Sequence, residues 1–484
     1  MVFKIWFRSL LALAVVALCA IPAFAQRAGQ NPGSWNKLIA NLEKDDFIVG
    51  EGESVHFDPI GKYCNDEFPN ALYANYGAPY ASGRIPASPR LPEGAADVED
   101  PQIEPVFRLD PDEAIVLVGM TPPAEAFFSY QIYLAFRQFP GETEHQLLLN
   151  SLGDTVNIHT INTIGPDPFE RPMVIIFTPD RGIDARVRAA LRRAGYPASI
   201  VNTIVVPSAT LKLGFEEDSD IFLISNRNAI WVDEDAGDAY MAKPTFRVLR
   251  LTPEDEGVLD PFPTPPLRIR GTGQTEIDLT PTLDKLRQAI LDFYGSGYTA
   301  KEYITAEVAN EGFDYTQRHL LTLGDTRDAL YLGAGYMEEF GLDDDLKLAD
   351  GEFLIAYGLD HVATGKATYI NVNGYDSGPP KMALGSAYPV DLKDSAYQYL
   401  ELSDPAGELT YALKISRHCG TDEPFCLPLW IPDGCTHDGE PVVLNATTPL
   451  AIGFRLYLEP GTRIGPAYAE IVYDQIIKFT PVGP

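Results

Sequence analysis

Proline and glycine constrain this chain more than any other feature, because forty of each divide its 484 residues into short pieces. Between them lie short runs rich in β-branched and aromatic residues, such as AIVLVGM at 114–120 and FFSYQIYLAF at 127–136. Runs of this kind are typical of short strands bounded by turns. Helical periodicity is confined to fewer segments, at 184–197 and 282–295. The sequence therefore predicts an α+β, β-rich fold with two modules of short, mostly antiparallel strands and a few helices.

Two proline-rich stretches suggest where the modules begin and end, since proline favours extended, semi-rigid linkers. After a signal peptide (1–25), the predicted order is an N-terminal segment with a proline-rich linker (26–108), a first β-rich module (109–250), a second proline-rich linker (251–281), and a helix followed by a second β-rich module (282–484).

The two modules also invite comparison as an internal duplication. At an offset of 239 residues, Gly119 aligns with Gly358 and Tyr130 with Tyr369, and each copy reads as strand, glycine-containing turn and strand. The alternative interpretation is a pair of ordinary β-hairpins.

The N-terminus has the features of a secretory signal peptide. Lys4 and Arg8 precede an apolar run at 10–20, and the small-x-small sequence Ala-Phe-Ala at 23–25 is a cleavage signal. No later stretch has the roughly 20 apolar residues of a membrane helix. We therefore expect a secreted or periplasmic protein with no membrane insertion.

The net charge of −31 argues against nucleic acid as a partner, because binding phosphates requires a basic surface. A small-molecule or saccharide ligand is compatible with it, and the oligomeric state stays open.

Beyond the leader the chain has four cysteines, Cys64, Cys419, Cys426 and Cys435. An even number in an exported chain favours two disulfides, with three pairings open. One of these pairs Cys419 with Cys426 in a short loop and Cys64 with Cys435 across the chain. The competing hypothesis is a metal site that adds His418 and His437, although the CxxC spacing common in zinc sites is missing.

The segment YGLDHVATGKATY, at 357–369, contains the candidate acid-base residues Asp360 and His361. It resembles a phosphate loop only superficially, since six residues separate its two glycines and alanine replaces the required serine or threonine. A histidine oriented by a carboxylate can act as a general base. In the alternative interpretation, the aspartate caps a turn and the histidine bonds locally.

The segment LGDTRDALY, at 323–331, supplies Arg327 between two aspartates and echoes LGDTVNIHT at 152–160. An arginine there could clamp an anionic substrate, so we group Arg327 with Asp360 and His361 as catalytic candidates. The RNAIW segment at 227–231 repeats the Arg-x-Ala pattern, and such reuse also fits a structural corner. A helix with four arginines, at 186–193, is a further candidate anion site or a solvated helix face.

Two acidic runs, at 233–238 and 343–352, suggest one structural calcium ion, because calcium prefers several carboxylate oxygens. The second run provides the predicted ligands Asp343, Asp345 and Asp350. No other cofactor is indicated.

Two functions are compatible with these features. The first is a ligand- or surface-binding β-rich protein without catalysis. The alternative is an exported hydrolase or lyase that acts on an extracellular small molecule or saccharide, with the Asp/His site in the second module.

Overall fold

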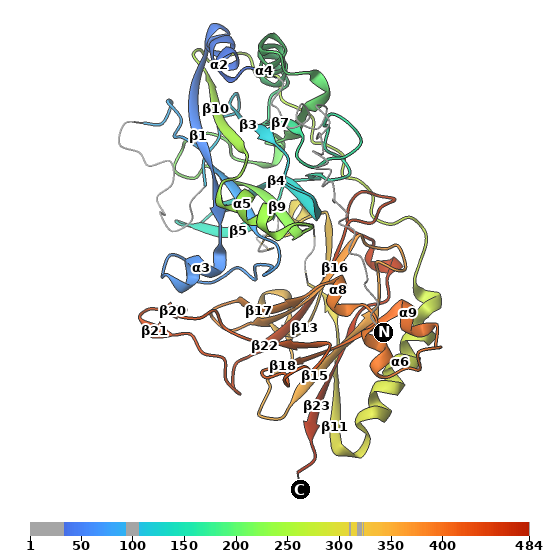
Figure 1. The fold of residues 1–484 in the computed structure, drawn as a ribbon. Helices are drawn as coiled ribbons and strands as arrows, with labels where there is room; N and C mark the ends of the chain where they lie inside the picture. Colours follow the sequence, from blue (N-terminus) through green and yellow to red (C-terminus); the bar gives the residue numbers. More distant parts are fainter. Residues whose placement is uncertain (1–32, 93–105, 309–310, 317–321, 323, 484) are drawn as a thin grey trace, which may run out of the picture.

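The computed structural model describes residues 33–92, 106–308, 311–316, 322 and 324–483. The predicted signal peptide lies outside these residues. The predicted β-rich α+β fold is confirmed. Figure 1 shows two halves in chain order, the first coloured blue to green and the second yellow to red.

The first half is built on one ten-stranded sheet that bends at the long strand β1 (Phe47–Phe57). The bend divides the sheet into two arms, and β1 belongs to both of them. Residues 47–52 of β1 pair with β10 in one arm, and residues 53–57 pair with β2 in the other. One arm continues through β10 (Phe246–Pro253), β3 (Ala114–Met120), β7 (Pro172–Thr178) and β8 (Val201–Val205). The other continues through β2 (Tyr80–Arg84), β9 (Ile221–Trp231), β4 (Glu125–Gln138) and β5 (His145–Ser151), with β6 (Val156–Asn157) on β4.

Apolar side chains fill the space between the two arms and also cover the outer face of the first. Leu117 and Ile175 of one arm pack in the same cluster as Ile132 of the other. The helices α2 (Trp35–Lys44) and α4 (Arg181–Ala194) bury their apolar stripes on the outer face. The smaller helices of this half are α3 (Pro59–Cys64) and α5 (Glu234–Ala242).

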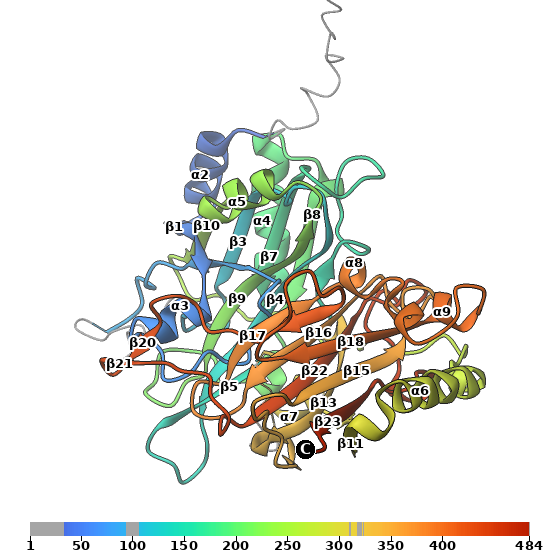
Figure 2. The ribbon, with the colours of Figure 1, turned by 60° about the horizontal axis from the view of Figure 1, so that its bottom comes forward.

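The second half has two separate sheets packed face to face. One contains β11 (Tyr298–Tyr303), β23 (Gln475–Pro481), β15 (Phe353–Leu359), β18 (Thr410–Ser416) and β19 (Cys426–Pro428). The other contains β12 (Ala306–Glu307), β13 (Ala329–Met337), β22 (Leu450–Tyr457), β16 (Tyr369–Asp376) and β17 (Met382–Ala387), with β14 (Leu342–Asp343) on β13. Helix α6 (Thr280–Tyr294) covers the outer face of the first sheet through Leu283, Leu286 and Ile290 (Figure 2). Three short helices, α7 (Gly312–Tyr315), α8 (Pro389–Leu392) and α9 (Ala406–Leu409), and the hairpin of β20 (Thr436–His437) and β21 (Glu440–Pro441) complete this half.

The strand pairings of the first half recur in the second. The pairs β3–β7, β3–β10 and β10–β1 correspond in chain order to β15–β18, β15–β23 and β23–β11. The pairs β4–β9, β4–β5 and β9–β2 correspond to β16–β22, β16–β17 and β22–β13. Even the parallel pair β7–β8 has a counterpart in β18–β19.

The two halves contact each other through what we call their inner sheets. These are the arm of the first half that contains β2, β9 and β4, and the sheet of the second half that contains β13, β22 and β16. Phe127 and Ala229 of the first half share an apolar cluster with Tyr369 and Tyr457 of the second, and the rings of Phe127 and Tyr457 lie 4.8 Å apart. The predicted module boundaries stay predictions. Strand β2 lies within the stretch that we assigned to a proline-rich linker, where it joins β1 to β9.

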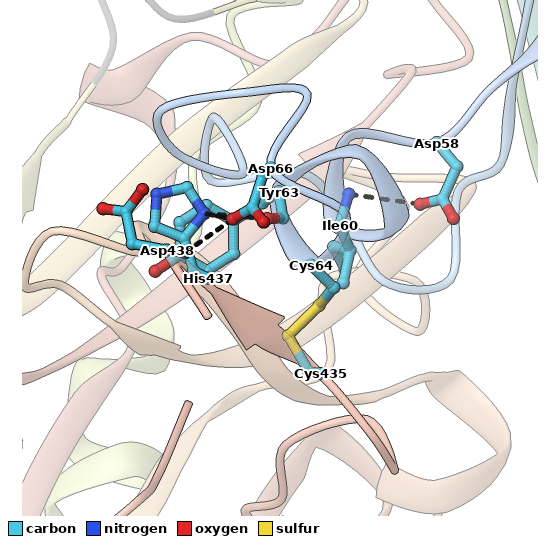
Figure 3. The surroundings of a disulfide bond; sticks show 8 residues. All are labelled: Asp58, Ile60, Tyr63, Cys64, Asp66, Cys435, His437 and Asp438. Atoms are coloured by element: carbon cyan, nitrogen blue, oxygen red, sulfur yellow. Dashed lines mark hydrogen bonds and ion pairs between the residues drawn. A yellow bond between two sulfur atoms is a disulfide. The ribbon is translucent and has the colours of Figure 1, made fainter. Parts of the chain in front are cut away.

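The structure contains two disulfide bonds, Cys64–Cys435 and Cys419–Cys426. The first joins helix α3 to the loop before β20 (Figure 3). All four cysteines are thus bonded to sulfur, as the two predicted disulfides require, and the competing hypothesis of a metal site built on them is excluded. In the described part of the chain, no helix has the length and apolar character needed to cross a bilayer.

Candidate functional site

The three predicted catalytic residues occupy separate structural roles. Asp360 caps the turn after β15, where its Oδ1 accepts hydrogen bonds from the backbone N–H groups of Val362 at 3.0 Å and Ala363 at 3.2 Å. This is the local capping role that we considered as the alternative.

His361 is completely buried between two carboxylates. Its Nδ1 lies 2.9 Å from Glu276 and its Nε2 lies 3.3 Å from Asp474. Burial lowers the pKa of His361, but the charges of Asp474 and Glu276 raise it by more, to about 10. Both ring nitrogens are engaged and the ring is protonated at neutral pH. In this form it cannot act as a general base.

Arg327 connects the two halves. Its guanidinium lies 2.6 Å from Asp154, in the first LGDT segment, and 2.5 Å from Glu311. The neighbouring Asp328 accepts hydrogen bonds from Thr155 at 2.6 Å and Asn157 at 2.7 Å. The two similar segments therefore bind each other, as expected of a structural corner.

Asp325 and Asp328 of this corner are both buried carboxylates. Burial raises the pKa of Asp325, although hydrogen bonds from Ser151 and Gly312 oppose the shift. Burial likewise raises the pKa of Asp328, to about 6, against the hydrogen bonds from Thr155 and Asn157.

The predicted calcium ligands do not gather at one point. Asp345 pairs with Lys347 at 2.7 Å, Asp350 pairs with Arg417, and Asp343 is exposed at the end of β14. Among the described residues, Asp66, His437 and Asp438 form a group of three in which each side chain has one possible ligand atom within 4.8 Å of the other two (Figure 3). His437 already uses Nδ1 at the Tyr63 carbonyl, 2.9 Å away.

Arginines of helix α4 form ion pairs with neighbouring acidic residues. Arg188 pairs with Asp184 at 2.8 Å, and Arg193 pairs with Asp45. The acidic run at 233–238 starts helix α5, where Asp233 is the N-cap. Both features are explained by local structure.

A different set of residues meets in a cavity between the inner sheets of the two halves. The cavity has a volume of about 60 Å³, several times the roughly 10–15 Å³ that one water requires. Its polar lining comprises two arginines, four tyrosines, one threonine and one carboxylate: Arg227, Arg455, Tyr73, Tyr80, Tyr331, Tyr375, Thr322 and Asp325. We call this the inter-sheet cavity.

Arg227, on β9, is 5% exposed and makes only neutral contacts. It donates one hydrogen bond to the hydroxyl of Tyr331 at 3.3 Å and one to the carbonyl of Gly324. The rings of Tyr80 and Tyr133 lie 5.6 and 5.7 Å from its guanidinium carbon. Its Nε has no hydrogen-bond acceptor in the described structure.

Arg455, on β22, is similarly buried and also makes neutral contacts. Its Nη2 donates to the carbonyl of Tyr73 at 2.8 Å and to the hydroxyl of Tyr375 at 2.7 Å. The rings of Tyr331 and Tyr375 lie 5.4 and 5.9 Å from its guanidinium carbon.

Three other buried cations in the described part of the chain have acidic partners. Arg137 lies 2.6 Å from Asp220, Arg250 lies 2.9 Å from Glu113, and Lys366 lies 2.8 Å from Glu459. Within the described residues, by contrast, no carboxylate oxygen lies within 4.0 Å of the Arg227 or Arg455 guanidinium. A buried charge is normally paired, so these two arginines stand out in a chain with a net charge of −31.

The inter-sheet cavity adjoins an open groove of about 550 Å³. The groove and the cavity share Ala74 and Tyr80 in their linings. The wall of the groove includes both cysteines of the Cys64–Cys435 disulfide. A third hollow of about 50 Å³ also borders Tyr80 and Arg227. The three hollows therefore lie next to one another around Tyr80.

Sequence reasoning had named Arg227 only as part of a repeated pattern and had missed Arg455. The available signal was an arginine within a strand that has apolar residues on both sides, as in FLISNRNAIW and AIGFRLYLE. Glu276 and Asp474, the partners of His361, were missed as well, because they are distant from it in sequence.

No protein-family model matches the chain. No curated protein matches it. Among solved structures it is similar to the crystal structure of the VPA0106 protein from Vibrio parahaemolyticus, with 13% identity, 87% of this chain and 97% of that chain covered, and a TM-score of 0.37. It is also similar to the partial N-terminal region of an enterococcal surface protein, with 11% identity, coverage of 87% and 85%, and a TM-score of 0.15. Likenesses of this degree carry no argument about fold or function.

Proposed function

We propose that this protein is an exported, non-catalytic binding protein that holds a small anionic ligand in the inter-sheet cavity. The observation that carries the proposal is the pair of buried guanidinium groups, Arg227 and Arg455, that face this cavity without a carboxylate partner. Export follows from the predicted signal peptide, and the two disulfides are compatible with it.

Physical chemistry favours an anion here. A guanidinium presents a planar set of N–H donors that matches a carboxylate, sulfate or phosphate group. An ion pair inside a cavity that largely excludes water is stronger than one on the surface. The tyrosine rings add cation–π attraction that holds the arginines in place. Burial raises the pKa of Tyr375 to about 12, so its hydroxyl stays neutral and does not repel an anion.

The hydrolase or lyase hypothesis stays a prediction, and the described geometry gives it no support. His361 and Arg327 use their polar atoms in buried ion pairs. Neither residue lines the inter-sheet cavity or the adjoining groove.

The test is calorimetric titration of the purified mature protein with sulfate, phosphate and short carboxylates, with neutral sugars as the comparison class. We expect at least one of the anions to bind and Arg227→Met to weaken that binding about 30-fold or more, as expected for the loss of a buried charge pair. The same variant should be at least as resistant to unfolding as the wild type without ligand, because methionine removes an unpaired buried charge.

Arg84→Met is the matched control. It removes the same charge from strand β2, where Arg84 is exposed and pairs with Glu53. Its anion binding should equal that of the wild type. The proposal is overturned if none of the anions binds, or if Arg227→Met binds as the wild type does while losing several kcal/mol of stability.

A further inference from the structure

The two unpaired arginines occupy equivalent positions in the two halves. Arg227 lies on β9, opposite Tyr80 of β2 and Ser129 of β4. Arg455 lies on β22, opposite Tyr331 of β13 and Asn371 of β16. Strands β2, β4 and β9 are the counterparts of β13, β16 and β22 in the repeated pairing pattern. In this comparison Ser129 matches Asn371. The offset of 239 residues that the sequence predicted would have matched Ser129 to a residue three positions earlier.

The surroundings of the two arginines match as well. The guanidinium of Arg227 lies over the rings of Tyr80 and Tyr133, and that of Arg455 lies over the rings of Tyr331 and Tyr375. In each set, the first tyrosine lies directly opposite the arginine on a neighbouring strand, β2 or β13. The second comes from the central strand, four residues after the residue opposite the arginine.

The contacts between the halves are reciprocal. Arg227 of the first half donates to the carbonyl of Gly324 in the second half. Arg455 of the second half donates to the carbonyl of Tyr73 in the first half. Gly324 precedes Tyr331 of β13 by the same distance in sequence as Tyr73 precedes Tyr80 of β2, and both acceptors have positive φ angles, 84° for Gly324 and 48° for Tyr73. The left-handed backbone at Tyr73 is unusual for a residue with a side chain, which indicates that this position needs that conformation.

From these equivalences we infer that the halves are internal duplicates and that the ligand carries two acidic groups, one for each arginine, as in a short α,ω-dicarboxylate. This inference rests on the proposed function. Each half contributes one unpaired guanidinium to the same cavity, so a ligand with a single charge would leave one of them buried without a partner.

The size of the site limits the ligand to a short one. The hydroxyl of Tyr331 accepts a hydrogen bond from Arg227, while its ring lies 5.4 Å from the guanidinium carbon of Arg455. One tyrosine therefore contacts both arginines. Like charges this close repel each other when buried, and two carboxylates joined by a few carbons would neutralise both.

The experiment compares diacids with monoacids of the same chain length. Succinate and glutarate are titrated against butyrate and pentanoate, with the wild type, Arg227→Met, Arg455→Met and the Arg84→Met control. We expect the wild type and the control to bind a diacid about 30-fold more tightly than its matched monoacid, since a second charged hydrogen-bonded pair is gained. Each single cavity variant should bind both members of a pair with similar affinity.

The outcomes separate this inference from the proposed function. If the monoacids bind the wild type as tightly as the diacids, or if sulfate binds as tightly as glutarate, the two-group ligand is ruled out while anion binding stands. Equal ligand affinity of Arg455→Met and the wild type would also overturn the inference. If neither carboxylates, sulfate nor phosphate binds, both proposals fail together.

Discussion

Replacing His361 by leucine is expected to lower the free energy of unfolding by about 3–5 kcal/mol at pH 6.5, because it leaves two buried carboxylates without their cation. Glu276 and Asp474 both contact the imidazole, and neither is exposed to water that could replace it. Urea unfolding of the variant and the wild type measures this difference.

The pH dependence of that difference identifies its cause. The folded pKa of His361 is about 10 and lies above the ordinary value of 6.5. Its stabilisation is therefore fully present below about pH 6.5 and is lost as the pH rises through about 10. Burial raises the pKa of Glu276, but His361, together with hydrogen bonds from Thr364 and the backbone N–H of Val472, lowers it by more, so the contribution of Glu276 is present at neutral pH and is lost in acid. We expect the gap between wild type and His361→Leu to shrink between pH 7 and 10.

His418→Leu serves as the control, since His418 is exposed and its replacement should change stability by no more than about 0.5 kcal/mol. A gap that stays constant from pH 6.5 to 10 would show that His361 contributes through packing alone and not through its charge.

Removing the Cys64–Cys435 disulfide is expected to have the other large effect. This bond joins residues 371 apart in sequence, whereas Cys419–Cys426 joins residues seven apart. In the chain-entropy model, the long loop contributes about 6 kcal/mol and the short loop about 2.5 kcal/mol. We therefore expect the double variant Cys64→Ser, Cys435→Ser to unfold at a clearly lower urea concentration than Cys419→Ser, Cys426→Ser.

The two double variants are matched controls for each other, since each replaces one disulfide by two serines. The Cys64–Cys435 bond also joins helix α3 to the loop at 432–435 (Figure 3). Residues of both segments line the groove beside the inter-sheet cavity. Equal losses from the two double variants would contradict an effect of loop length.

Local patterns in the sequence were enough to predict several elements. The segment at 184–197 supplies most of helix α4, which ends at Ala194, just before Gly195 adopts a positive φ of 97°. The segment at 282–295 belongs to α6. Short apolar runs bounded by turns became strands, such as β3 and β15. These elements follow from hydrophobic periodicity and turn residues, which are properties of neighbouring positions.

Other features depended on contacts that neighbouring positions do not reveal. Strand β2 lies in a proline-rich stretch, yet it pairs on both sides with distant strands. His361 looked like a catalytic residue because Glu276 and Asp474 lie about a hundred residues away in sequence. The inter-sheet cavity was missed for the same reason, since Arg227 and Arg455 meet only after the two halves pack together.

The most direct measurement is a crystal structure of the mature protein soaked with glutarate. The account predicts electron density for the diacid in the inter-sheet cavity, with one carboxylate within hydrogen-bonding distance of Arg227 and the other of Arg455. A well-ordered structure at saturating glutarate in which both guanidinium groups contact only water and tyrosine would contradict it.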